Sequence, residues 1–321
     1  MSRRKQSKFI KSIIGLIVAA CIVGGSYLGA EVLQNQENAV TAEKTVNNSI
    51  PLEADDQLQI YFFDVGQADS ILLISDGETM LIDAGNNEDG DMLVEKIKGL
   101  GITTLNYVIG THPHEDHIGG LDDIIENFEI ENVYMPKIQT NTKTFEDVLD
   151  ALQEKNLSVT APEVGSTFVV GKARCEVMQC GQGTAEEKNN LNLSSIVIRT
   201  TFGEQSFLFM GDSETENEEA RIWPQTNVLK VAHHGSDTSS SESFLEQIKP
   251  QIAMISVGEG NSYGHPAQVT LNKLSNIDCR VYRTDEMGTI LLRSDGIENK
   301  ITTEKWRVVK VSSKRKSKFQ M

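Results

Sequence analysis

The sequence predicts a mixed α/β domain, of the α/β or α+β class. Its 321 residues, 39% of them hydrophobic and 24% charged, have the composition of a folded globular protein and not of a disordered or multi-span membrane chain. Strand-length apolar runs are followed by alternating strands and amphipathic helices, and this order occurs twice along the chain. The repeated order suggests two sheets packed together with helices outside, an αββα sandwich.

The first half begins with three consecutive strands bounded by Gly, Asp and Asn, as expected of antiparallel neighbours. An amphipathic stretch that ends at glycine then predicts a helix, and strands and helices alternate after it. In order, we predict strands at 58–65, 69–75 and 78–85, a helix at 88–101, a strand at 105–111, a helix at 121–128, a strand at 131–136 and a helix at 144–156.

The second half repeats this order in outline. Apolar runs of strand length again precede an alternation of strands with amphipathic helices, and two strands close the domain. We predict strands at 175–180, 194–202 and 205–212, a helix at 213–223, a strand at 228–235, a helix at 241–248, a strand at 252–258, a helix at 268–274 and strands at 280–284 and 289–294.

The N-terminal segment has the features of a membrane-targeting sequence. A basic end, residues 1–12, precedes residues 13–30, which have no charged side chain and just reach the length of a membrane-spanning helix. Positive charges before this run predict a single-pass anchor in the cell membrane, with everything after it exported to the extracytoplasmic side. A cleaved secretory signal, or a lipoprotein cleaved at Cys21, is the alternative. Residues 31–56 are polar and lack periodicity, which predicts a flexible stalk.

Charge is distributed unevenly along the chain. The formal net charge is −16, yet both ends are basic, and residues 12–303 hold 18 Lys and Arg against 45 Asp and Glu. An acidic body repels nucleic-acid phosphates at long range, so DNA binding would need bound metal, a local pocket or the basic tail predicted at 298–321.

The four cysteines have no CxxC spacing, which argues against a disulfide framework or a structural zinc knuckle. We expect Cys175 and Cys180 to be buried free thiols, with a hairpin disulfide between them as the alternative.

Three of the six histidines fall within six residues, in the run His112-Pro-His114-Glu-Asp116-His117. Such a run arises by chance on the order of once in several thousand chains of this length, which disfavours the alternative of surface histidines at a helix start. A loop after a strand can direct three imidazoles and a carboxylate toward one point. These groups suit zinc, manganese or iron, so the run predicts a metal centre.

These motifs resemble those of the metallo-β-lactamase-fold hydrolases, and among them the extracytoplasmic domain of the ComEC-type DNA-uptake (competence) proteins. The resemblance runs from about Leu58 to Ser294. Periodicity alone supports only a mixed α/β domain, so a metallo-β-lactamase sandwich over 57–297 rests mostly on this resemblance. The matching runs are YFFDVGQADSILL with MLIDAG, THPHEDHIGG, SSIVIRTTF with FLFMGD, VLKVAHHGS and NSYGHP.

The resemblance implies two divalent metal ions, zinc or manganese, around a bridging hydroxide that acts as the nucleophile. Asp64 resembles the first-motif aspartate, which supports the metal-binding loop by hydrogen bonds. The alternative for Asp212, a turn with an N-cap for the acidic helix that follows, is disfavoured by the histidines. The implied ligands are His112 and His114 for the first ion, Asp116, His117 and His234 for the second, and Asp212 for both.

The chain departs from the wider family in one respect. No histidine occurs from 118 to 232, where many members place another ligand of the first ion. Asn192 stands where the DNA-uptake branch carries an asparagine, so we expect an oxygen ligand or water to complete that site. The loss of one imidazole should tilt the preference toward harder ions such as manganese.

The best candidates for contact with substrate are His233, Ser236 and His265, with Asn261 and Tyr263 in the same loop as His265. Either histidine would hydrogen-bond a phosphate oxygen or protonate a leaving group. The alternative for each histidine is a loop side chain packed against backbone. Together with Asp116, the two histidines are the predicted catalytic residues.

The favoured function is an exported, metal-dependent phosphodiesterase, with DNA as the substrate class that the resemblance implies. One alternative is a cell-surface phosphoesterase that acts on phosphorylcholine or teichoic-acid groups, since an acidic body tolerates cationic substrates better than DNA. Another is a non-catalytic metal-dependent binding module. The sequence indicates no particular protein partner.

Overall fold

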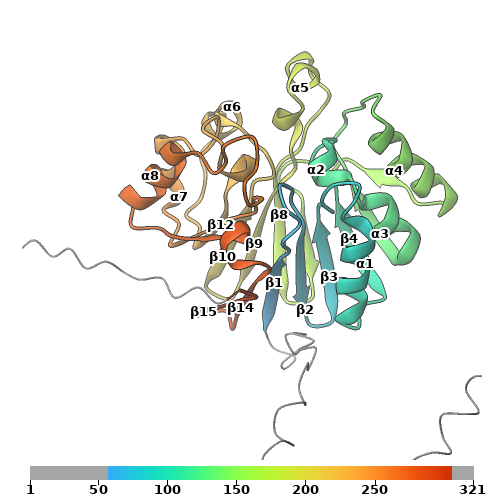
Figure 1. Cartoon of the computed structure of the whole chain (residues 1–321), viewed down its shortest axis with the longest axis horizontal. Coiled ribbons are helices and arrows are strands. Elements are labelled where there is room, and N and C mark those ends of the chain that lie inside the picture. The colour runs from blue at the N-terminus through green and yellow to red at the C-terminus, as the bar shows by residue number, and fades with distance from the viewer. Residues whose placement is uncertain (1–56, 306–321) are drawn as a thin grey trace, which may run out of the picture. The chain divides into compact units, whose positions relative to one another are not determined.

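The structure, a computed structural model, describes residues 57–305, whose strands form two sheets packed face to face (Figure 1). The eight-stranded sheet contains, in spatial order, β15 (Asn299–Thr303), β14 (Ile290–Ser294), β1 (Leu58–Phe62), β2 (Ile71–Ser75), β3 (Glu78–Ile82), β4 (Thr104–Ile109), β5 (Glu129–Tyr134) and β6 (Val159–Thr160). The seven-stranded sheet contains β13 (Arg280–Arg283), β12 (Ile252–Ile255), β11 (Val228–Lys230), β10 (Gln205–Phe209), β9 (Val197–Phe202), β8 (Ala173–Gln179) and β7 (Thr167–Val170).

Helices cover the outer faces of the sheets, which gives the predicted two-sheet, mixed α/β arrangement (Figure 1). On the eight-stranded sheet lie α1 (Gly90–Gly99), α3 (Leu121–Asn127) and α4 (Lys143–Glu154), and on the other sheet lie α7 (Glu242–Ile248) and α8 (Gln268–Asn276). The shorter helices are α2 (Glu115–Ile118), α5 (Ala185–Asn189), α6 (Thr215–Glu219), α9 (Thr284–Met287) and the 3-10 turns Leu191–Ser194 and Ala232–Gly235.

Strand β1 is buried at every position because both faces of its sheet are covered. Leu58, Ile60 and Phe62 belong to the core between the sheets, whereas Tyr61 packs in the core beneath the helices. Phe62 meets Phe209 of the other sheet, with ring centroids 6.5 Å apart. The two-residue period of a strand therefore assigns alternate side chains to two different cores.

Helix α4 shows why the amphipathic stretches fold as predicted. The Thr142 hydroxyl accepts a hydrogen bond from the Phe145 N–H at 3.3 Å, which caps the start of the helix. Phe145, Val148 and Leu152 are buried against the eight-stranded sheet, at the spacing of one helical face.

Several short elements were not expected from the sequence. Strands β6, β7 and β15 and helices α5 and α9 lack an apolar run of sufficient length, and α6 is shorter than the helix predicted at 213–223. The edge strand β15 pairs with β14, so the first residues of the tail predicted at 298–321 belong to the sheet. Cys175 and Cys180 are buried free thiols, as predicted.

The basic end, the predicted anchor at 13–30 with Cys21, the stalk and residues 306–321 lie outside the described residues. Within residues 57–305, no helix has the length and apolar character that a membrane span requires.

Parallel pairing brings the loops with the metal motifs to one edge of the fold. Strand β3 runs parallel to β4, and β10, β11 and β12 run parallel to one another. Because the carboxyl ends of parallel strands meet at the same edge, the loops after these strands converge there.

Candidate metal centre

Loops that follow three strands bring four of the predicted ligands together. Asp116 and His117 lie on α2, after β4, while Asp212 follows β10 and His234 follows β11. One ligand atom from each of these four residues lies within 4.8 Å of all the others.

The Asp212 carboxylate lies between the two histidine loops. Its Oδ1 is 3.2 Å from Nε2 of His117, and its Oδ2 is 3.7 Å from Nε2 of His234. The same Oδ2 is 4.0 Å from Nε2 of His112. Asp116 reaches this place from α2, with its Oδ2 3.3 Å from Nε2 of His234. One carboxylate thus faces histidines from both loops, which is the position that a bridging ligand would need.

His112 and His114, predicted for the first ion, are adjacent, with 2.9 Å between Nε2 of the former and Nδ1 of the latter. Asn192 donates through Nδ2 to Glu214 at 3.0 Å, and its buried Oδ1 has no hydrogen-bond partner within residues 57–305. Its role as an oxygen ligand stays a prediction.

Three buried atoms of this centre have no hydrogen-bond partner in the described part of the chain: Oδ1 of Asp212, Nε2 of His117 and Nε2 of His234. Buried polar atoms are nearly always paired, so unpaired atoms that face one another indicate a place for a cation. Imidazole nitrogen and carboxylate oxygen are ligands of zinc and manganese. The residues therefore fit a centre for divalent metal ions.

Buried charges of both signs surround this place. Burial lowers the pKa of His117, but the carboxylates of Asp212 and Asp83 outweigh it and hold that pKa well above its ordinary value. Burial opposes ionisation of Asp212, yet His117 and His234 keep its pKa well below the ordinary value. A metal ion that binds must therefore displace protons from the histidines.

Asp83 is a functional residue that the sequence reasoning missed. Its Oδ1 accepts the Thr111 N–H at 2.8 Å, and its Oδ2 lies 2.8 Å from the Thr111 hydroxyl and 2.7 Å from Nδ1 of His117. The available signal was an aspartate directly after the apolar run of β3, beside the parallel strand β4.

The prediction that Asp64 supports the metal-binding loop is wrong. Its carboxylate lies 3.2 Å from the Lys305 amine, and its N–H donates to the Thr289 hydroxyl at 3.3 Å. Asp83 holds the loop instead, because it follows β3, the strand that pairs directly with β4. The opening motif contributes a different aspartate, Asp69, whose Oδ1 lies 3.4 Å from Nδ1 of His234.

His233 lies at the rim of the centre, and its role in substrate contact stays a prediction. Its Nε2 is 3.7 Å from Oδ2 of Asp212, and its Nδ1 is 3.1 Å from the Thr238 hydroxyl and 3.4 Å from Oε1 of Glu214. His233 and His234 have φ angles of 50° and 49°, in the left-handed region that side-chain-bearing residues rarely adopt. Such strained backbone clusters at functional sites.

His265 and Tyr263 lie beside His233. The His265 ring is edge-on to His233 at 5.6 Å between centroids and is stacked on Tyr263 at 5.9 Å. Tyr263 is 72% exposed, and buried Nδ1 of His265 has no hydrogen-bond partner among residues 57–305. The Asn261 amide binds backbone groups of Gly258 and His265, so this side chain shapes the loop.

Ser236 does not line the cavity at the centre, although it was a candidate for substrate contact. Its side chain is buried, and its hydroxyl lies 3.2 Å from the Thr238 hydroxyl and accepts the Thr238 N–H at 3.3 Å. It therefore fixes the turn that carries Thr238.

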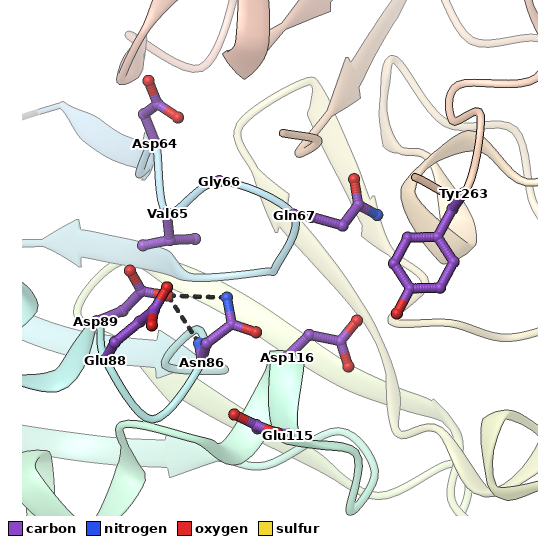
Figure 2. A pocket seen from close by; sticks show the side chains of 10 residues that line it. All are labelled: Asp64, Val65, Gly66, Gln67, Asn86, Glu88, Asp89, Glu115, Asp116 and Tyr263. Carbon is purple, nitrogen blue, oxygen red and sulfur yellow. Dashed lines mark hydrogen bonds between the residues drawn. The ribbon is translucent and has the colours of Figure 1, made fainter. Parts of the chain in front are cut away.

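The centre opens into a cavity of about 310 Å³ that His114, Asp116, Asp212, His233, His234 and His265 help to line. Next to it lies a cavity of about 470 Å³, and both are lined by Gln67, Glu115, Asp116 and Tyr263. Figure 2 shows this larger cavity, with Gln67 and Tyr263 at one end and Asp64 at the other. Its carboxylates come from Asp64, Glu88, Asp89, Glu115 and Asp116.

A family model described as the metallo-beta-lactamase superfamily matches residues 63–259. ComE operon protein 3 of Bacillus subtilis is 32% identical over 206 residues, which cover 63% of this chain and 26% of the relative. Recombination protein 2 of Haemophilus influenzae is 27% identical over 239 residues, which cover 72% of this chain and 28% of the relative. The chain thus spans only about a quarter of the length of these relatives.

Among solved structures, the metallo-beta-lactamase fold protein YhfI from Bacillus subtilis matches with a TM-score of 0.50 and 11% identity. The match covers 74% of this chain and 100% of that protein. At this identity the likeness concerns the fold alone.

Proposed function

The chain belongs to the metallo-beta-lactamase superfamily, and from that premise we propose that it is a metal-dependent phosphodiesterase that cleaves DNA. Membership supports a metal-dependent hydrolase. A relative named as a recombination protein supports nucleic acid as the substrate.

The position of Asp212 between the two histidine loops carries this proposal. Asp212 would hold both ions, with His112 and His114 on one and Asp116, His117 and His234 on the other. Bound divalent ions would supply positive charge to polarise a phosphoryl oxygen and would lower the pKa of a bound water. They would also offset the acidic character of the body locally.

His233 is the residue best placed to contact the substrate. Its side chain is 23% exposed at the cavity, while Thr238 and Glu214 lie beside its Nδ1. With Nδ1 held in this way, Nε2 is directed toward the centre and can hydrogen-bond a nonbridging phosphate oxygen.

The test is cleavage of plasmid, linear duplex and single-stranded DNA by the purified full chain with Mn²⁺. We expect cleavage that a chelator stops and that the Asp212→Ala variant lacks. Two bound metal ions without cleavage of any of the three DNAs would overturn the proposal of a DNA substrate.

A second candidate function is favoured by the acidic cavity beside the centre. Its five carboxylates and the exposed Tyr263 ring suit a quaternary ammonium group, which carboxylates and aromatic faces attract. A phosphoesterase acting on phosphorylcholine, or on teichoic acids that carry it, would place its cationic group there. Hydrolysis of p-nitrophenyl-phosphorylcholine without DNA cleavage would favour this function. Turnover of neither substrate by the metal-loaded protein would favour a binding module.

We also propose that the domain is exported and that residues 13–30 anchor it in the cell membrane. The uncharged length of this run and the basic residues before it support the proposal. Recovery of the intact chain in the membrane fraction, with the domain open to added protease on whole cells, is the expected result.

A further inference from the structure

Lys230 is the only Lys or Arg that is buried within residues 57–305. One residue, Asp69, lies between its amine and the implied metal ligand His234. The residue ends β11, four positions before His234. Long charged side chains are almost never fully buried unless they are paired. The amine donates to Oδ2 of Asp69 at 2.7 Å and to the backbone oxygen of Val231 at 3.1 Å.

Asp69 connects this amine to the metal centre in two ways. Its other oxygen, Oδ1, has no hydrogen-bond partner among the described residues and lies 3.4 Å from Nδ1 of His234, which is also 3.0 Å from the backbone oxygen of Ser256. Its backbone N–H donates to the backbone oxygen of Asp116 at 3.0 Å. Asp69 therefore touches two of the implied ligands of the second ion.

We propose that Lys230 is a positioning residue for the second metal ion, acting through Asp69 on the imidazole of His234. The inference rests on the metal centre of the proposed function and is independent of which substrate is cleaved. The Ser256 backbone oxygen and the Asp69 carboxylate both face Nδ1 of His234, and acceptors on this side of the ring direct Nε2 at the metal.

The amine of Lys230 holds the Asp69 carboxylate in place. Both side chains are buried, and Oδ1 of Asp69 has no hydrogen-bond partner among the described residues. Without the amine, the buried carboxylate would be left uncompensated and would have to move toward another partner. A displaced Asp69 would no longer hold the backbone of Asp116 or lie against the His234 ring.

The test measures metal binding in four variants: Lys230→Met, Asp69→Asn, the double variant, and Lys188→Met as a matched control at an exposed site. Calorimetry with Mn²⁺ gives the number and affinity of sites, and Co²⁺ absorption reports the ligand geometry of each site. We expect Lys230→Met to weaken one of the two sites by about 10–100-fold and to change its Co²⁺ spectrum. The control should match the unmodified chain.

The double variant decides whether the effect runs through Asp69. It replaces a buried ion pair with neutral groups of similar size, so it should fold even if the single Lys230→Met variant does not. We expect its weakened site to match that of Asp69→Asn, since the proposal attributes the effect of Lys230 to its bond with Asp69 and not to its bond with the Val231 backbone oxygen. Two sites of normal affinity and spectrum in Lys230→Met or in the double variant would overturn the proposal. Additive losses from the two single changes would also overturn it.

Discussion

Nδ1 of His117 lies 2.7 Å from Oδ2 of Asp83, and both side chains are completely buried. The ring thus has a carboxylate on each side, since its Nε2 faces Asp212 at 3.2 Å. Asp83 also accepts the Thr111 N–H at the start of the same loop. One side chain after β3 therefore fixes both the path of the metal-binding loop and the orientation of one of its ligands.

Asp83→Asn should weaken metal binding by about 10–100-fold, because an amide holds the His117 imidazole less firmly in the required tautomer. Titration of the metal-free chain with Mn²⁺ measures this. Asp64→Asn is the matched control, since the same change at a residue that contacts Lys305 should leave the affinity unaltered. Equal losses of Mn²⁺ affinity in the two variants would contradict the role of Asp83 in orienting His117.

Asp212→Ala and His114→Ala should each lower turnover of a phosphodiester substrate by at least about 10²–10³-fold, since each removes an implied metal ligand from a preorganised site. The fold should persist, because both sheets are held by cores formed from other residues. Circular dichroism checks the fold, and hydrolysis of bis-p-nitrophenyl phosphate checks the activity. Full activity in either variant would refute the dinuclear centre.

Long apolar runs made most of the fold predictable from the sequence. Strands such as β1 and β2, which are buried on both faces, can be predicted from their largely apolar composition. Edge strand β15, with the sequence NKITT and only partly buried side chains, carries no such signal, and its pairing with β14 depends on tertiary context.

The implied metal ligands were predictable because they occur in dense motifs, whereas the groups that orient them were not. Asp83 and Asp69 adjoin apolar strands and are far in sequence from His117 and His234, which they contact. Lys230 is near His234 in the sequence, but nothing there indicates that its amine is buried against Asp69. Asp64, Asp69 and Asp83 each adjoin an apolar run, so the sequence does not distinguish them. The pairing of the strands determines which of their side chains contact the metal centre.

Stability of the metal-free protein should fall as pH rises from about 6.5 to about 10. Burial lowers the pKa of His234, but Asp212 and Asp69 outweigh it and raise that pKa from 6.5 to about 10. A raised folded-state pKa contributes stability in full below the unfolded value and loses it as pH passes the folded value. Thermal unfolding in EDTA across this range measures the fall, and His234→Gln should show a smaller one. A melting temperature that is constant with pH in the unmodified chain would contradict this prediction.

Manganese should support activity at least as well as zinc. Within the described residues, the implied first site has two imidazoles and the shared Asp212, and its remaining candidate, Asn192, offers an amide oxygen. Fewer nitrogen ligands and more oxygen ligands favour the harder ion. Activity measured while each metal is titrated into the metal-free chain tests this, with calcium as a control for divalent charge. Strict dependence on zinc would contradict it.

The substitution Gly119→Ala should both destabilise the metal-binding loop and weaken metal binding. A Cβ atom at Gly119 would lie 2.2 Å from the backbone carbon of Asn86 and 2.3 Å from the backbone nitrogen of Asn87, so α2 and the turn after β3 would have to separate. Overpacking of this kind costs about 1–3 kcal/mol, and the movement would shift His117, two residues earlier.

Gly99→Ala is the matched control for this change. A Cβ atom there meets nothing within 4 Å, and alanine is favoured over glycine in a helix by roughly 0.5–1 kcal/mol. Urea unfolding of the metal-free chains should therefore show Gly99→Ala as stable as the unmodified protein or more so, and Gly119→Ala less stable. If Gly119→Ala kept both normal stability and normal Mn²⁺ affinity, the close contact between α2 and the turn at Asn86 would not be what holds His117 in place.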